Sequence, residues 1–320
     1  MIHTLFSDLH AIDLPVPYSV KTVNVVVSTS DPVTLIDTGI HSDASLHGLK
    51  RQFAELGIGL EDLSHVVLTH HHSDHMGLAG YLQDYYGVTV SMLKEDILHA
   101  QNRHVRQALQ EHWAHLGCHG LPKEAFPTEQ EWEASGHEAW PCPEIQPLKI
   151  GEHIPLAGQN FQVLHLPGHT DGHLGLWNPE MGFLISGDVL LQNTTPHIGC
   201  YADSNPDPIL DHLRSLDQIE QLGPQQIVPG HFGFVVEGSD ISDCIQHTRK
   251  RHQNRMGRLE SQVAGENQTA FEYAQKLFPR AVGASKRSAL VTTIAYLEHL
   301  RLSGKITRQF GGGTWKYHPC

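Results

Sequence analysis

The chain has 320 residues, a hydrophobic content of 39% and a formal net charge of −13 at pH 7. This length suits one large domain with a smaller one, and the acidic balance argues against a dedicated nucleic-acid or membrane-surface binder. The charge is uneven, because residues 249–320 hold 13 Lys and Arg against 4 Asp and Glu, a balance of +9, which leaves 9 against 31, a balance of −22, for residues 1–248.

The N-terminal segment lacks the basic start and the continuous apolar run of a signal peptide. No apolar run in the chain reaches the ~18–20 residues of a membrane span. Five scattered cysteines without a CxxC spacing argue against a disulfide framework and against a thiolate zinc knuckle. We therefore expect a cytoplasmic protein without a membrane partner.

Short β-branched runs separated by turn residues predict strands in two groups of four. The predicted strands cover residues 22–28, 33–39, 65–70, 87–91, 161–168, 173–178, 182–188 and 226–231. Helical patterns over residues 43–57 and 206–223 separate some of these strands. Strands that are interleaved with helices predict an α/β architecture with a central sheet.

Two further segments depart from this alternation. Residues 95–146 read as an insertion with a helical first half and a Pro-rich second half that carries Trp132 and Trp140. Near the C-terminus, helical patterns are followed by a Gly-turned hairpin of β-forming residues, which resembles a small winged-helix module. We therefore predict a main domain over residues 1–238 and a helical linker with a winged-helix-like domain over residues 239–320.

Metal-type ligands follow the predicted strands at five places. These ligand candidates are Asp37, His70, His72, Asp74, His75, His169, Asp188 and His231. Strands of one sheet that end at the same edge deliver their end residues to one crevice. Imidazole and carboxylate groups are ligands of zinc and related cations, and a set without thiolates is not typical of a purely structural site. The sequence therefore predicts a catalytic metal centre.

The spacing indicates how two ions could share this set. In an extended segment alternate residues face the same way, so His70 and His72 can bind one ion. Asp74 and His75 begin the next predicted helix, and the turn before it can direct them to a second ion, with Asp188 able to bridge the two. The alternative is an accidental cluster in a chain in which 26 of 320 residues are histidine.

In this order, the ligand candidates resemble the signature of the metallo-β-lactamase superfamily over residues 20–235. The resemblance implies an αββα sandwich with a dinuclear site at one edge. It implies three ligands for each ion: His70, His72 and His169 for one, and Asp74, His75 and His231 for the other. Asp188 would bridge the ions, and Asp37 would orient the ligands. The C-terminal region looks like the winged-helix domain of the subgroup that contains the β-lactamase-like protein 2 hydrolases.

The five histidines and the bridging aspartate resemble the glyoxalase II, lactonase and nuclease branches more than the antibiotic-degrading enzymes. The flavodiiron branch usually has Glu where this chain has His72, which disfavours redox chemistry at a di-iron centre. We therefore expect a hydrolase of a small ester, thioester or lactone that uses two zinc ions, or iron or manganese in their place. The alternatives are an endoribonuclease or other phosphodiesterase, with the basic C-terminal region holding phosphates, and a mononuclear-iron persulfide dioxygenase.

The expected reaction uses a water between the two ions, whose pKa falls to about 7 and which attacks as hydroxide. Asp74 is the candidate to orient this hydroxide and to pass its proton to the leaving group. Tyr201 is a candidate oxyanion donor, with a buried structural role as the alternative. The insertion is expected either to roof an apolar acyl pocket or only to pack or form a homodimer contact. The expected partner is a small molecule, and nucleic acid is the less favoured alternative.

Overall fold

The computed structural model describes the chain from residue 1 to residue 320 except for residues 103–105, 129, 132–136, 143 and 193. Trp132, which we placed in the insertion, therefore lies outside the described residues. None of the described helices is both long enough and apolar enough to cross a bilayer.

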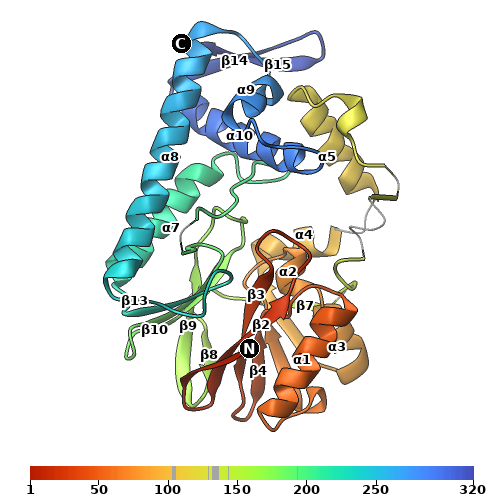
Figure 1. Ribbon diagram of the computed structural model, residues 1–320, viewed down its shortest axis with the longest axis vertical. Helices are drawn as coiled ribbons and strands as arrows, with labels where there is room; N and C mark the ends of the chain where they lie inside the picture. The colour runs from red at the N-terminus through yellow and green to blue at the C-terminus, as the bar shows by residue number, and fades with distance from the viewer. Residues whose placement is uncertain (103–105, 129, 132–136, 143, 193) are drawn as a thin grey trace.

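Two sheets lie face to face in the lower half of Figure 1. The first sheet has the order β1 (Ile2–Phe6), β2 (Leu9–Pro15), β3 (Thr22–Ser28), β4 (Val33–Ile36), β5 (Leu63–Val67), β6 (Thr89–Leu93) and β7 (Ile145–Leu148). The second has the order β13 (Val236–Glu237), β12 (Gln226–Pro229), β11 (Phe183–Gly187), β10 (Leu174–Asn178), β9 (Gln159–His165) and β8 (His153–Leu156). Their facing sides bury one apolar cluster, to which Val26 and Val67 contribute from the first sheet and Phe161 and Phe183 from the second.

Helices cover the outer face of each sheet. On the first sheet, α1 (Asp43–Glu55) and α3 (Ala79–Tyr86) bury Phe53 and Leu82 against Val25. Along β3, Val25 therefore faces the helices and Val26 the other sheet, because side chains alternate along a strand. On the second sheet, α7 (Pro208–Leu222) and α8 (Ser239–Gly265) pack on the outer face. The layers are thus helix, sheet, sheet and helix, and the predicted αββα sandwich is confirmed.

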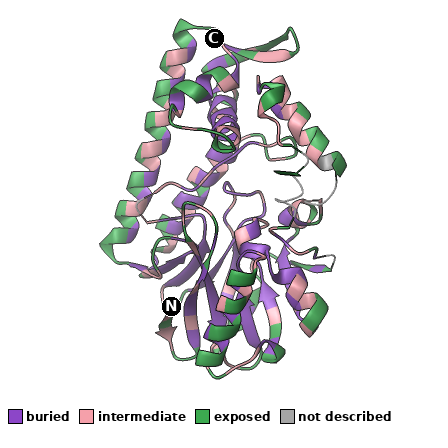
Figure 2. Cartoon of the chain, turned by 45° about the vertical axis from the view of Figure 1, so that its right-hand side comes forward, coloured by how far each residue is buried: buried purple, intermediate pink, exposed green. Residues whose placement is uncertain are grey.

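The remaining elements complete the chain, and the last two helices and the C-terminal hairpin among them lie above the sandwich in Figure 1. The remaining elements are η1 (Leu60–Asp62), α2 (Ser73–Met76), α4 (Lys94–Asn102), α5 (Arg106–Cys118), η2 (Lys123–Ala125), α9 (Ala270–Leu277), α10 (Ser285–Leu302) and the hairpin β14 (Ile306–Gly311) and β15 (Thr314–Pro319). The long helix α8 runs from the second sheet up to this region, with much of its outer surface exposed (Figure 2). The order of helices and hairpin is the one expected, and the winged-helix assignment remains a prediction.

The insertion packs against the C-terminal region. Leu116 of α5 belongs to the same buried cluster as Leu259 of α8, Tyr273 of α9, Tyr296 of α10 and Tyr317 of β15. This contact joins segments that are more than a hundred residues apart in the sequence, and no local pattern indicated it.

All eight predicted strands are present, as β3 to β6 and β9 to β12, whereas β1, β2, β7, β8 and β13 were not predicted. Of these, β7 has only four residues with Pro147 among them, β8 also has four, and β13 has two. Strands as short as β7, β8 and β13 carry too few alternating positions for a pattern to stand out.

Strand direction places the ligand-bearing loops at one edge. In the first sheet β4 and β5 are parallel. In the second, β10 is antiparallel to both β9 and β11, and β11 is parallel to β12, so β9, β11 and β12 run the same way. The loops that follow these strands leave each sheet at its carboxyl end, which is where ligands bind in such sheets.

Candidate metal centre

All eight ligand candidates lie just beyond strand ends, where the two sheets meet. The first sheet positions five of them: Asp37 after β4, His70 and His72 in the loop after β5, and Asp74 and His75 in α2. The second sheet positions three: His169 after β9, Asp188 after β11 and His231 after β12. Neither sheet alone contains the site.

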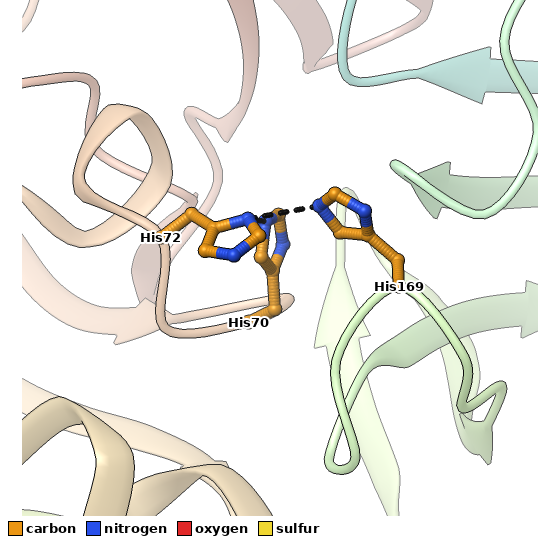
Figure 3. Close-up of side chains that lie close together, drawn as sticks. All are labelled: His70, His72 and His169. Carbon is orange, nitrogen blue, oxygen red and sulfur yellow. Dashed lines mark hydrogen bonds between the residues drawn. The ribbon is translucent and has the colours of Figure 1, made fainter. Parts of the chain in front are cut away.

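His70, His72 and His169 form the first group, whose donor atoms all lie within 4.8 Å of one another (Figure 3). His72 Nδ1 lies 3.1 Å from His70 Nε2 and 2.9 Å from His169 Nε2. On its far side, His169 Nδ1–H donates to the backbone carbonyl of His197 at 2.6 Å. Burial lowers the pKa of His169 and keeps the ring neutral. Because a carbonyl only accepts, Nε2 of that neutral ring carries a lone pair that faces the group.

Thr69 and Asp37 orient His70 so that its Nε2, like that of His169, faces the first group. Thr69 Oγ1 donates to Asp37 Oδ2 at 2.7 Å and accepts from His70 Nδ1–H at 3.0 Å. The Thr69 backbone N–H donates to the other oxygen of Asp37, also at 2.7 Å. Burial and the neighbouring His75 hold the pKa of His70 well below its usual value. His70 Nε2 therefore carries a lone pair, which faces His72.

Asp74, His75 and His231 form the second group. His75 Nδ1–H donates to Asp37 Oδ2 at 2.7 Å, and His231 Nδ1–H donates to the backbone carbonyl of Thr22 at 2.6 Å. These bonds turn both Nε2 atoms inward, and His231 Nε2 lies 3.4 Å from Asp74 Oδ2. Asp37 thus orients ligand candidates of both groups, as expected of a residue behind the ligands.

Asp188 lies between the two groups. Its Oδ1 is 3.6 Å from His75 Nε2, and its Oδ2 is 3.6 Å from His169 Nε2 and 3.4 Å from His231 Nε2. A third group with donor atoms within 4.8 Å of one another consists of His70, His75 and Asp188. The carboxylate therefore reaches residues of both other groups, which is the position a bridging ligand needs.

Local backbone geometry permits this close packing. Asp37 has a φ of 61°, a left-handed conformation that non-glycine residues adopt at a cost and that clusters at functional sites. Its three hydrogen bonds to Thr69 and His75 hold it there. Gly230 follows β12 directly, and a Cβ at this position would clash with Asp188 Oδ1. Only glycine allows the backbone to pass so close to that carboxylate.

The residues present fit bound metal ions. His75 Nε2 and Asp188 Oδ1 are buried and have no hydrogen-bond partner, although an unpaired buried polar atom is costly. A cation between the groups would satisfy both atoms. Five imidazoles and two carboxylates without a thiolate are typical of catalytic sites for zinc and related cations.

Protons and metal ions compete for these donors. Burial opposes the charged form of His75, but the carboxylates of Asp188, Asp37 and Asp74 raise its pKa well above the usual value. At His231, Asp188 likewise outweighs burial and raises the pKa to about 10. A metal ion that binds Nε2 of either ring must therefore displace a proton.

Asp96 of α4 is a supporting residue that the sequence analysis missed. It is fully buried and accepts from the His71 backbone N–H at 3.0 Å, from His71 Nδ1–H at 2.9 Å, from Thr170 Oγ1 at 2.7 Å and from the Gly172 backbone N–H at 2.6 Å. It thereby ties the loop after β5 to the loop after β9. A signal existed, because Asp96 follows β6 as Asp37 follows β4.

His173 is a second missed residue. Its Nε2 accepts the Asp188 backbone N–H at 3.0 Å, and its ring stacks on His70 at 4.8 Å. Burial lowers the pKa of His173 to about 3, so the ring remains a neutral acceptor. In a chain this rich in histidine, nothing local distinguished it from the others.

A cavity of about 310 Å³ adjoins the first group, with His72 and His169 in its wall. Tyr201 also lines it, and its hydroxyl lies 3.3 Å from His197 Nε2. The predicted oxyanion donor is therefore beside the site. Asp171 and Asp203 place carboxylate groups in another part of the wall.

The insertion contributes to this cavity through its helices. The contributing residues are His99 and Asn102 of α4 and Leu109 and His112 of α5. Trp140 does not line the cavity: its Nε1–H donates to Asp84 Oδ2 of α3 at 2.7 Å, and its ring packs on Tyr81. The insertion thus lines this cavity without Trp140, and its role as a roof over an acyl group stays a prediction.

Comparisons with known proteins find a matching family and similar structures. The sequence profile described as the Metallo-beta-lactamase superfamily matches residues 20–231. A solved structure of a metallo-beta-lactamase family protein from Thermus thermophilus superposes with a TM-score of 0.88 at 32% identity, covering 99% of this chain and 100% of that one.

Two curated proteins are also similar. The probable metallo-hydrolase YqjP of Bacillus subtilis is 28% identical over 318 residues, which is 96% of each chain. The hydroxyacylglutathione hydrolase GloC of Haemophilus influenzae is 27% identical over 179 residues, which is 56% of this chain and 71% of that protein.

Zinc binding should release protons. Because the raised pKa values of His75 and His231 keep these rings protonated at neutral pH, a ligating imidazole must first lose its proton. Chelator-treated protein titrated with zinc should give heats that differ between buffers of different ionisation enthalpy, and affinity should fall as the pH falls. Identical heats in all buffers would contradict the predicted protonation.

Asp37→Ala should weaken metal binding. Loss of the carboxylate removes the hydrogen bond that holds Nδ1 of His75. It also removes the partner of Thr69, which holds Nδ1 of His70. Such changes cost about 10–100-fold in metal affinity. Competition with a chromogenic chelator measures this, and circular dichroism checks the fold. Asp43→Ala, on the exposed first turn of α1, is the matched control. Equal affinity in both variants would rule out the orienting role.

Proposed function

The chain belongs to the metallo-β-lactamase superfamily as a metallo-hydrolase, and we propose that its substrate is a small ester, thioester or lactone, with thioesters as the leading class. The observation that carries this proposal is the cavity of about 310 Å³ against His72 and His169. A volume of this order holds a small molecule. It places an acyl group directly beside the donor atoms.

The chemistry of the wall favours an acyl substrate over RNA. Leu109, His112 and Tyr201 supply apolar and aromatic surface, whereas Asp171 adds a carboxylate and Asp203 adds another that pairs with His99 at 3.2 Å. Carboxylates in the wall oppose the approach of a phosphate backbone, whose binding depends on cationic side chains. The relative from Haemophilus influenzae supports the thioester class, because an acylglutathione is a thioester.

We assign the ligands as two sets of three, His70, His72 and His169 for one ion and Asp74, His75 and His231 for the other, with Asp188 shared. Two divalent cations there, zinc in our proposal, would lower the pKa of a water to about 7 and polarise the carbonyl oxygen. The chain's own contribution is orientation. Asp37 and the carbonyls of Thr22 and His197 fix the outer nitrogens of the rings, so the inner nitrogens are set before substrate arrives.

Asp74 is the proposed proton carrier. It is the more exposed carboxylate of the site, with 14% of its side chain accessible against 9% for Asp188. Burial would raise its pKa, but His75 and His231 outweigh this and lower it, which keeps the carboxylate ionised. Asp74 can therefore orient the attacking water, accept its proton and deliver that proton to the leaving thiolate or alkoxide.

Tyr201 is the proposed oxyanion donor. Tyr201 lines the same cavity as His169, and in our proposal its hydroxyl donates to the carbonyl oxygen as negative charge develops. A donor of this kind acts on the transition state more than on the bound substrate.

A hydrolysis panel tests the function. Zinc-loaded protein should cleave acyl thioesters or lactones with a higher kcat/KM than β-lactams or single-stranded RNA, because the cavity is small and partly acidic. Chelation should abolish the activity, and His169→Ala prepared in the same way controls for contaminants. RNA as the preferred substrate would overturn the proposal.

Asp74→Asn should lower kcat by about 10²–10⁴-fold, because positioned proton transfer contributes that much. Tyr201→Phe should lower kcat with little change in KM, since the lost hydrogen bond forms with the oxyanion. Asp203→Asn, in the wall but outside the donor groups, is the control and should affect KM more than kcat. Metal analysis of each variant is needed, and near-normal kcat in metal-loaded Asp74→Asn would contradict the role.

A further inference from the structure

A second, larger cavity of about 710 Å³ lies in the C-terminal region. Arg255 and Arg258 of α8 and Arg280, between α9 and α10, line it. Apolar residues form another part of its wall: Leu277, Phe278, Pro279 and Ala281. We propose that this cavity is a binding site for an organic anion that carries a phosphate, phosphonate or carboxylate group next to an apolar part.

The three arginines have no carboxylate partner among the residues that the structure describes. The four acidic residues of the segment 249–320 are all engaged elsewhere: Glu260 with Lys305, Glu266 with Lys276, Glu298 with Arg301 and Arg308, and Glu272 with the backbone N–H of Thr269. By contrast, Arg249 on the same helix pairs with Asp217 at 2.7 Å and with Glu220 at 3.0 Å. Three uncompensated guanidinium groups around one cavity attract an anion.

Arg255 is held in place before any ligand binds. It donates to Tyr296 Oη at 3.2 Å and lies over the Phe278 ring, with 5.4 Å between guanidinium carbon and ring centre. Arginine has five N–H donors in a fixed fork, so the donors left over are available to a ligand. A positioned guanidinium loses little conformational freedom when it binds a phosphate or carboxylate.

A chain of hydrogen bonds fixes Tyr296 from behind. Burial lowers the pKa of His212 to about 4 and that of His252 to about 2, so both rings are neutral. His212 Nε2–H donates to the Val189 carbonyl at 2.8 Å, His252 Nε2–H donates to His212 Nδ1 at 2.9 Å, and Tyr296 Oη–H donates to His252 Nδ1 at 2.7 Å. Tyr296 has thus used its proton and must accept from Arg255, which sets the direction of that bond.

The cavity adjoins the metal centre through His197, which also lines it. The His197 carbonyl accepts from His169, its Nε2 lies 3.3 Å from Tyr201 Oη, and its Nδ1 lies 3.2 Å from Thr292 Oγ1. An anion bound here is therefore either the charged end of a substrate whose acyl group lies at the metal centre, or a separate effector. Both have the same chemistry, and the site itself does not depend on the substrate proposed above.

The binding test uses calorimetry of the zinc-loaded full chain with phenylphosphonate, which has an apolar ring beside a non-hydrolysable anion. The double variant Arg258→Gln/Arg280→Gln should weaken binding by about tenfold or more, because each charged hydrogen bond contributes on that scale. Both side chains are exposed, so the fold is retained. Lys250→Gln, which removes a charge from α8 outside the cavity, should bind as the wild type does. The uncharged dimethyl ester of the ligand should not respond to either change.

Equal affinity in the wild type and the double variant would overturn the site. So would binding that survives in the double variant and disappears on metal removal, since the phosphonate would then sit on the metal ions. Neither result depends on turnover, so failure of the proposed hydrolysis is a separate outcome.

Turnover distinguishes the two sources of the anion. For a substrate end, the double variant should raise KM for a thioester with a carboxylate on its thiol and leave KM for a neutral thioester unchanged. For an effector, phenylphosphonate should alter turnover of the neutral thioester in the wild type and not in the double variant. Either pattern supports an anion site at these arginines.

Discussion

Seven donor groups, five of them buried, converge on one small volume, and their lone pairs repel unless positive charge lies between them. The surrounding structure follows from that constraint. Backbone carbonyls of Thr22 and His197 and the carboxylate of Asp37 hold the outer nitrogens of three rings. The inner nitrogens therefore face one another. Protons or metal ions must supply the positive charge that offsets the repulsion between their lone pairs. The site is thus organised from its periphery inward.

The sandwich makes that periphery rigid. Ligand candidates come from both sheets, so their separation depends on the apolar layer between the sheets and on direct ties between loops. Asp96 is one such tie, because its buried carboxylate joins the loop after β5 to the loop after β9 through four hydrogen bonds. Gly230 allows the loop after β12 to approach Asp188 without a clash. Small changes in either would move whole ligands and not single atoms.

Hydrogen bonds connect the C-terminal region to the metal centre along two routes. One connection runs from Tyr296 through His252 and His212 to the carbonyl of Val189, next to Asp188. The other runs through His197 to His169. The first connection runs through buried side chains and has a defined hydrogen-bond direction, whereas the second is partly buried. The basic region and the acidic sandwich are therefore packed together around the site, which agrees with the opposite charge of their sequences.

The sequence by itself determined the ligand candidates, the eight principal strands and the layered α/β class, because strand alternation and strand-end residues are local patterns within a few positions. The pattern His70, His72, Asp74, His75 could be recognised without knowing where the chain goes next. Tertiary structure alone decided which partners meet: Asp96 with Thr170, His173 with Asp188, Trp140 with Asp84, and three arginines around one cavity. These contacts join residues from separate elements, and burial, which sets their protonation and their need for partners, exists only once the chain has folded.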